Sequence, residues 1–94
     1  MKGEDGDRFV GKTRKGKREG RGTIYNASGE MVCTGTFRKG LLEGQGTVRY
    51  LDGTGRRYVG EFKGGKKDGE GVLYDREGTV LFEGKWKADK IHIE

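Results

Sequence analysis

Residues 58–71 decide the fold of this chain, and they read YVGEFKGGKKDGEG. The first five residues, from Tyr58 to Phe62, carry an aromatic ring, a glycine and a second aromatic ring at every second position. The last three place glycine at alternate positions. An alternation of two is the side-chain period of a β-strand, and glycines this frequent would cost about 1 kcal/mol each inside a helix. We therefore expect two strands joined by a turn at Gly65, which is a β-hairpin.

The same pattern recurs along the chain with a spacing of 24 or 25 residues. The first block returns as Phe9-x-Gly11-x-Thr13, Cys33-x-Gly35-x-Phe37 and Phe82-x-Gly84-x-Trp86, and the second block returns as Gly20-x-Gly22 and Gly44-x-Gly46. A period of this size is typical of stacked supersecondary units rather than of one globular core. We expect units at residues 9–32, 33–57 and 58–81 and a partial unit at 82–90. A lead-in at 1–8 that could be flexible and an end segment at 91–94 would flank them.

Composition limits the chain to one small domain. Its 94 residues are 30% hydrophobic and 37% charged, with a net charge of +5 and a pI near 9.4. Such a charge permits an anionic partner without naming one. Cys33 is the only cysteine, which leaves no internal disulfide, no zinc site and no metal centre to expect. No apolar run resembles a signal peptide or a membrane span, so we predict a cytoplasmic protein without cofactors.

The alternation also predicts a register within each hairpin. Placing Phe62 opposite Gly69 sets Gly60 opposite Gly71 and Tyr58 opposite Leu73, so that aromatic rings lie over glycines. In this register Lys63 faces Asp68 and would form a cross-strand ion pair. Equivalent positions flank the other turns as Arg14 with Glu19 and Arg38 with Glu43. Turn positions are expected at Gly16, Gly40, Gly65 and Asp89, and between units at Gly29, Gly53 and Gly78.

Residues 58–71 closely resemble the membrane occupation and recognition nexus (MORN) repeat, whose pattern runs Tyr-x-Gly-x-Trp, a glycine turn and then Gly-x-Gly. The segment Phe82-Glu83-Gly84-Lys85-Trp86 matches the opening of that pattern, and the resemblance covers about residues 9–90. Thr13 and Cys33 depart from it where aromatic residues are usual. The resemblance implies an all-β fold, a single extended twisted antiparallel sheet of successive β-hairpins. It also implies a non-enzymatic scaffold, a protein-binding module or a membrane-proximal module.

Residues 6–13, from Gly6 to Thr13, satisfy the P-loop pattern G-x-x-x-x-G-K-[ST]. A P-loop needs an apolar strand before it and a helix after it, so that backbone amides face the phosphates. Neither flank fits, and Gly11 is already explained as the repeat glycine. We interpret the match as coincidental and expect no nucleotide site. His92 is the lone histidine and no nucleophile has a plausible base, so we predict no enzyme activity.

Two surfaces are candidates for binding. The first is the aromatic and glycine face, which a single-layer sheet would leave uncovered; such patches mark binding surfaces for a peptide, a partner protein or a second copy. Its residues are Phe37, Tyr58, Phe62, Phe82 and Trp86, with Phe62 and Trp86 as anchors. The open edge near residues 82–94 could also add a strand.

The second surface is the basic segment at residues 8–21. It could contact anionic phospholipid or another anionic ligand weakly, at about 1 kcal/mol per basic group. Its candidate contacts are Lys12, Arg14, Lys15, Lys17, Arg18 and Arg21. Strand alternation sends these side chains in several directions, and nucleic acid is a less favoured partner because RNA-binding Arg-Gly tracts lack a fixed register. The leading prediction is a protein-binding scaffold, and the alternative is a peripheral membrane module.

Overall fold

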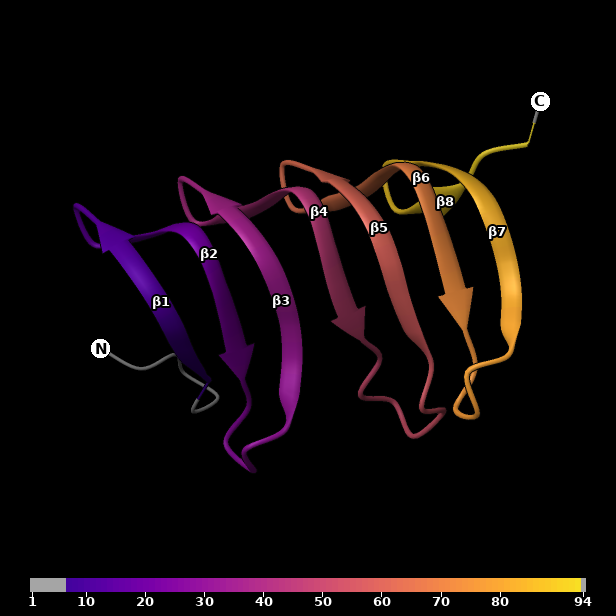
Figure 1. Ribbon diagram of the computed structural model, residues 1–94, viewed down its shortest axis with the longest axis horizontal. Coiled ribbons are helices and arrows are strands. Elements are labelled where there is room, and N and C mark those ends of the chain that lie inside the picture. Colours follow the sequence, from indigo (N-terminus) through magenta and orange to yellow (C-terminus); the bar gives the residue numbers. More distant parts are fainter. Residues whose placement is uncertain (1–6, 94) are drawn as a thin grey trace.

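A computed structural model describes residues 7–93, which form one antiparallel sheet. The sheet contains β1 (Arg8–Arg14), β2 (Lys17–Tyr25), β3 (Met31–Arg38), β4 (Leu41–Arg49), β5 (Arg57–Lys63), β6 (Lys66–Tyr74), β7 (Val80–Lys87) and β8 (Lys90–Ile91). Their order in the sheet is their order in the chain, and no helix occurs in the described range (Figure 1). The all-β fold of successive hairpins is confirmed. Most of the expected lead-in, residues 1–6, and the last residue of the end segment lie outside the described residues.

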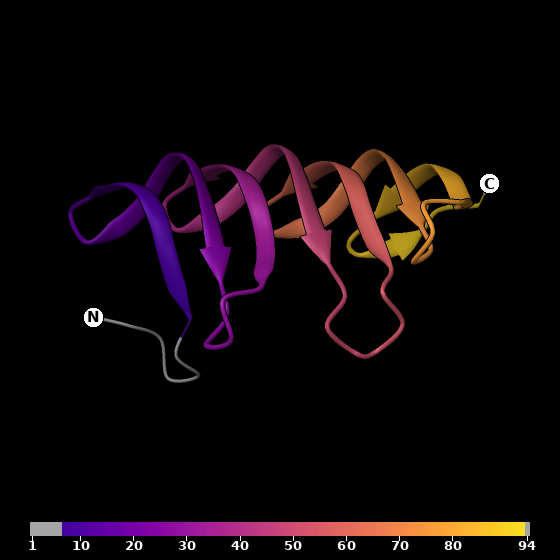
Figure 2. The same cartoon turned by 60° about the horizontal axis from the view of Figure 1, so that its bottom comes forward.

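The sheet is elongated and its strands are bent. The molecule measures 40 × 26 × 18 Å, and the strands follow one another along its length (Figures 1 and 2). The turns inside units lie along one long side of the sheet, and the loops between units lie along the other. The turns and the loops therefore each form a row of repeated local structure.

The turns inside the units share one conformation. The first turn residue has φ between 50° and 58° and the second between 75° and 89°, in pairs formed by Lys15 and Gly16, Lys39 and Gly40, Gly64 and Gly65, and Ala88 and Asp89. Positive φ at both central residues is the two-residue hairpin turn whose twist matches that of the strands. The expected turn positions are thus confirmed, including the one at which aspartate replaces glycine.

The predicted register of the hairpin formed by β5 and β6 is confirmed away from the turn and is wrong near the turn. Gly60 pairs with Gly71 and Tyr58 with Leu73, but a bulge then places Phe62 opposite Lys67 instead of Gly69. A bulge inserts extra residues into one strand and bends it, which a pure alternation of two cannot reveal. The glycine that faces Phe62 is Gly44 of the preceding unit. In the same way, Gly20 faces Phe37 and Gly69 faces Trp86.

Glycines form a continuous row across the sheet. Each pairs with the next on the neighbouring strand, in the order Gly11, Gly22, Gly35, Gly46, Gly60, Gly71 and Gly84. Aromatic rings occupy the space that side chains would take. A Cβ atom added at Gly71 would collide with the Tyr58 ring, and one added at Gly22 would collide with Phe9. The expectation that rings lie over glycines is confirmed.

The repeated acidic residue joins successive units. Glu19 accepts a hydrogen bond from the Lys39 amide at 3.3 Å, Glu43 from the Gly64 amide at 3.0 Å, and Asp68 from the Ala88 amide at 3.3 Å. The next amide donates to a carbonyl of the same preceding strand, as Gly65 does to Leu42 at 2.9 Å. Each acid is therefore a link to the following turn.

The expected ion pair between Lys63 and Asp68 is wrong. The bulge places Lys63 opposite Lys66, and the Asp68 carboxylate points to the turn of the next unit. Within residues 7–93 the ion pairs are Arg56 with Asp52 and Lys67 with Asp89. The repeated acid therefore does not neutralise the basic side chains of the hairpins, contrary to the expectation from the sequence.

A first prediction concerns this link between units. Glu43→Gln keeps the size of the side chain but removes the charge that strengthens its bond with the Gly64 amide, so a loss of about 1 kcal/mol in unfolding free energy is expected. Urea denaturation monitored by circular dichroism measures it. Glu83→Gln, at an exposed position on β7, is the control and should change stability by less than about 0.5 kcal/mol. Equal losses in both variants would contradict the role given to the acid.

Candidate interaction surface

The core of the sheet is a chain of aromatic rings. Phe82 contacts Trp86 with ring centroids 5.6 Å apart, Trp86 contacts Tyr58 at 5.1 Å, and Tyr58 contacts Phe62 at 5.2 Å. Phe9 and Phe37 form a similar pair at 5.2 Å nearer the N-terminus. All are edge-to-face contacts, the geometry that aromatic quadrupoles favour. Rings from separate units thereby hold the hairpins together.

Polar groups complete the contacts of these rings. The Tyr58 hydroxyl donates to the Glu61 carbonyl at 3.0 Å, and Trp86 Nε1 donates to the Gly71 carbonyl at 3.4 Å. Lys67 places its ammonium between 5.4 and 5.7 Å from three ring centroids, those of Tyr50, Tyr58 and Trp86. Cation–π contacts of this kind favour a partly desolvated lysine. The polar atoms of Tyr58 and Trp86 and the faces of these rings are therefore already contacted by other residues of the chain.

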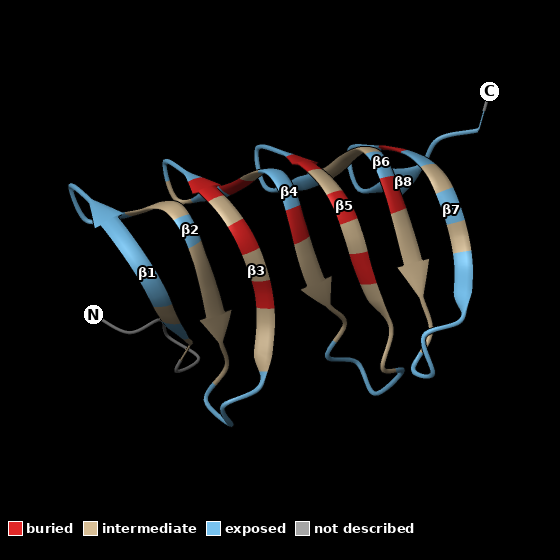
Figure 3. Cartoon of the chain, in the orientation of Figure 1, coloured by how far each residue is buried: buried red, intermediate tan, exposed pale blue. Residues whose placement is uncertain are grey.

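The aromatic face is less open than the sequence suggested. Phe37, Tyr58, Phe62 and Trp86 expose between 0% and 6% of their surface, and Phe82 is half-buried. The buried positions lie on β3 to β7, while β1 is mostly exposed (Figure 3). The reasoning from a single uncovered layer was wrong because bulges bend the strands and let the rings cover one another.

Tyr58 should make stability depend on pH. Burial raises the pKa of its phenol from the ordinary value of 10 to about 12. The unfolded chain then loses this proton above pH about 10 while the folded chain retains it, so stability present below that pH is lost as the pH rises toward 12. Urea midpoints at about pH 9 and about pH 11 should fall more in the wild type than in Tyr58→Phe. Parallel falls would contradict the assignment.

A shallow groove crosses β4, β5 and β6 beside Phe62. It has a volume of about 530 Å³ and is lined by Glu43, Gly44, Gln45, Glu61, Phe62, Lys63, Asp68 and Gly69. Phe62 is its one aromatic side chain, and Gly44 and Gln45 are exposed along it. Three carboxylates against one lysine give the groove a negative charge. Sequence reasoning named Phe62 but missed the acidic lining, because the lining depends on the bulges.

The basic segment is divided between the faces of the sheet. Strand alternation places Arg8, Lys12 and Arg14 on the face opposite the rings, where Lys17 pairs with Arg14. Arg21 shares that face, since it pairs with Thr36. Lys15 lies in the turn. Arg18 instead points to the aromatic side, where its guanidinium lies 5.5 Å from the Phe37 centroid and donates to the Gly40 carbonyl at 2.8 Å. Of the six residues that we named, Arg18 is thus held in a structural contact.

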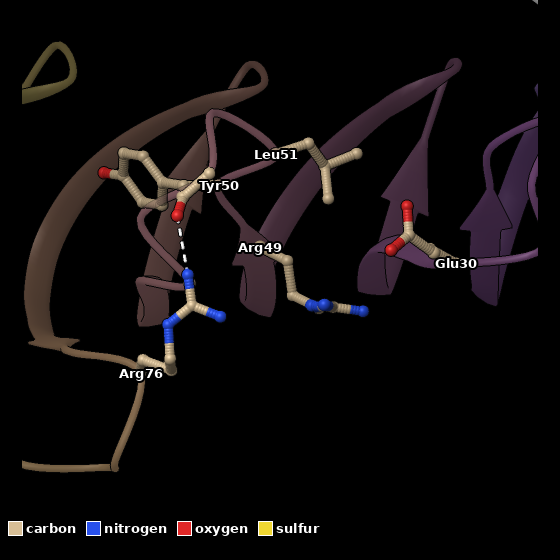
Figure 4. A pocket seen from close by; sticks show the side chains of 7 residues that line it. Glu30, Arg49, Tyr50, Leu51 and Arg76 are labelled. Atoms are coloured by element: carbon tan, nitrogen blue, oxygen red, sulfur yellow. Dashed lines mark hydrogen bonds between the residues drawn. The ribbon is translucent and has the colours of Figure 1, made fainter.

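A second, smaller cavity lies at the loop between β4 and β5. It has a volume of about 200 Å³ and is lined by Glu30, Arg49, Tyr50, Leu51, Gly53, Gly55 and Arg76 (Figure 4). Arg76 Nη2 donates to the Gly53 carbonyl at 2.6 Å, which ties this loop to the next one. Within the loop, hydrogen bonds from Thr54 hold the pKa of Asp52 below its usual value. The signal for this loop was the extra residue around Thr54 and Gly55 that lengthens one period to 25.

The described part of the P-loop match lies within a strand. Gly11, Lys12 and Thr13 belong to β1, which leads into a hairpin turn and β2, whereas Gly6 lies outside the described residues. Across residues 7–93, no group of three or more His, Cys, Asp or Glu side chains could hold a metal ion. The same range contains no helix that could cross a bilayer. Burial raises the pKa of the Cys33 thiol, which fits a core side chain.

A single-layer sheet built from repeated hairpins, with rings packed over a glycine row, defines this chain as a β-repeat protein. Comparison with protein-family models gives the family: the MORN repeat matches residues 10–31, 33–55, 58–80 and 82–92. The chain belongs to the MORN repeat family, as its sequence pattern indicated. A search of curated proteins finds no match to the chain. MORN repeats are scaffold modules that bind proteins or membranes and are generally not enzymes.

Proposed function

We propose that this chain is a non-enzymatic scaffold that holds a segment of a partner protein against the aromatic and glycine face of its sheet. The groove across β4 to β6 carries the proposal, because Phe62 and exposed Gly44 of this face line it. Phe62 would contact the partner directly at the groove. Phe37, Tyr58 and Trp86 are buried and would support this face from within, while half-buried Phe82 completes it. A cytoplasmic location near membranes is part of the same proposal.

The charge of the groove indicates what kind of segment would bind. Glu43, Glu61 and Asp68 lie around Phe62, with Lys63 as the one cation of the lining. An extended segment with an apolar side chain flanked by lysine or arginine would complement it. Contacts with exposed backbone would be helped by Gly44, which has no side chain to obstruct them. A basic and apolar peptide is thus favoured over an acidic one at this surface.

Site-specific photocrosslinking tests the proposal in cells that express the chain. A photoreactive residue replaces exposed Gln45 in the groove and, as the control, exposed Glu83 on β7, which does not line the groove. We expect a discrete protein adduct from position 45 that is absent from position 83. Equal adducts from both positions, or none from position 45, would contradict binding in the groove.

The exposed basic residues of β1 and β2 support an alternative function as a peripheral membrane module. Arg8, Lys12, Arg14, Lys17 and Arg21 share one face of this hairpin, and the Glu19 carboxylate binds the Lys39 amide instead of a cation. Co-sedimentation with anionic and neutral vesicles at two salt concentrations tests it. Anionic lipid binding should appear at low salt and fade at high salt. Equal binding to neutral vesicles would contradict an electrostatic contact.

A further inference from the structure

We propose that the edge of β1 that is unpaired within residues 7–93 accepts a strand from another protein, one that carries an acidic residue followed by Gly-x-Gly. The incoming strand would pair with β1 as the second strand of each unit pairs with the unit that follows. This surface is separate from the groove across β4 to β6. The inference therefore does not depend on the function proposed above.

The first observation is the exposed edge itself. Among residues 7–93, β1 pairs with β2 alone, although it is a strand of seven residues. Val10 in its middle is 53% exposed, and only Phe9 and Asp7 at its start are even partly covered (Figure 3). An edge strand presents unpaired N–H and C=O groups that can accept another strand. No proline interrupts this one.

The second observation is that the turn between β1 and β2 lacks the inter-unit hydrogen bonds that the three later turns make. At the three later turns, the two turn amides donate to an acid and to a carbonyl of the preceding unit, as Gly64 and Gly65 do to Glu43 and Leu42. Lys15 and Gly16 have the same turn conformation, with φ of 52° and 80°. Within residues 7–93, no hydrogen bond links their amides to another unit. The first turn thus presents two oriented donors for an acid and a carbonyl.

The third observation is the chemistry of the edge. Lys12, Arg14 and Lys15 are exposed along β1 and its turn, and the described ion pairs involve none of them. An acidic strand complements this charge. Gly11 belongs to the glycine row, so the incoming strand must approach it closely and would itself need glycine at the facing position.

The pairing of β6 with β7 shows how such a strand would lie. In that pair, Glu70 faces Lys85, Gly71 faces Gly84, and Asp68 accepts from the Ala88 amide. The equivalent positions on β1 are Lys12, Gly11 and Lys15 in the repeat. A strand with the sequence of β6 would therefore bring Glu70 to Lys12, Gly71 to Gly11 and Asp68 to the Lys15 amide.

A second copy of this chain fits the edge less well than another protein does. Its edge strands within residues 7–93 are β1, whose exposed lysines would repel those of another β1, and β8, which pairs with β7 at Lys90 and Ile91. There, His92 and Ile93 occupy the positions of Asp68 and Gly69 in the repeat. The acid and the first glycine are both replaced. The chemistry therefore points to a different protein as the partner.

The test uses a fluorescent peptide with the sequence of residues 65–75, GKKDGEGVLYD, and the full chain. Anisotropy titration should show saturable binding that weakens about fivefold when the peptide carries Asp68→Asn, the loss expected for one charged hydrogen bond. Lys12→Glu in the chain should weaken binding similarly. Thr13→Phe should strengthen it about threefold, because this position would regain the ring that faces glycine in later units. Circular dichroism establishes that each variant is folded.

Controls separate this proposal from its competitors. A scrambled peptide of equal charge should bind at least about fivefold more weakly. Gln45→Arg in the groove should leave peptide binding unchanged, which separates the edge from the proposed function. Equal binding of the scrambled peptide, or no binding at millimolar concentration, would overturn the inference. So would Lys12→Glu removing anionic vesicle binding while leaving peptide binding intact, since the edge would then be a lipid contact.

Discussion

Replacing Tyr58 with alanine should lower the unfolding free energy by about 3–5 kcal/mol, the usual cost of removing a large aromatic side chain from a core. Among residues 7–93, Tyr58 is the large side chain that has no exposed surface. Its ring contacts Phe62 and Trp86 edge to face, and its hydroxyl donates to the Glu61 carbonyl. The substitution would therefore leave a cavity where three strands meet. Urea denaturation monitored by circular dichroism measures the loss.

Tyr25→Ala provides a control in which a tyrosine is lost from the other face of the sheet. Tyr25 is half-buried and lies beneath the Arg8 guanidinium, 5.3 Å from its ring centroid. Its loss should cost no more than about 1.5 kcal/mol, because little buried area and one exposed cation–π contact disappear. Similar losses at both positions would show that the ring cluster is not the main source of stability.

Replacing Gly71 with alanine should cost about 3 kcal/mol, even though only one methyl group is added. A Cβ at this position would collide with the Tyr58 ring, which is fully buried and has no space into which to move. Gly46→Ala is the matched control, because it lies in the same glycine row and the nearest atoms to its added Cβ are 3.2 Å away. We expect Gly46→Ala to change stability by about 1 kcal/mol or less.

A double variant tests the physical cause of the Gly71 effect. Tyr58→Leu removes the ring with which the new methyl group would collide, so Gly71→Ala should cost at least about 1 kcal/mol less in that background. The four unfolding free energies of the cycle give this coupling directly. Strictly additive losses would contradict the collision between ring and glycine, and would point to backbone conformation at Gly71 instead.

The sequence predicts the fold well because its signals are local. The alternation from Tyr58 to Phe62 defines strands, and the pairing of Gly60 with Gly71 follows from superposing two such patterns across a turn. Turn positions could be read from glycine and from Asp89, the few residues that tolerate positive φ. Each of these features depends on residues close together in the chain.

The features that sequence reasoning missed depend on contacts between units. The bulge before Phe62 moves its partner from Gly69 to Lys67, and no local pattern marks the extra residues. Once the register changes, Asp68 no longer faces Lys63 and instead binds the next turn. The repetition of the acid was visible in the sequence, but its partner lay about 20 residues away. The acidic groove depends on the same bulges and so could not be predicted either.

Hydrogen–deuterium exchange of the chain, alone and with the partner captured from position 45, tests the central claim most directly. A partner held in the groove should slow exchange at residues 43–45 and 61–69 while leaving β7, which does not line the groove, unchanged. Protection confined to β7, or none at residues 43–45 and 61–69, would contradict binding in the groove.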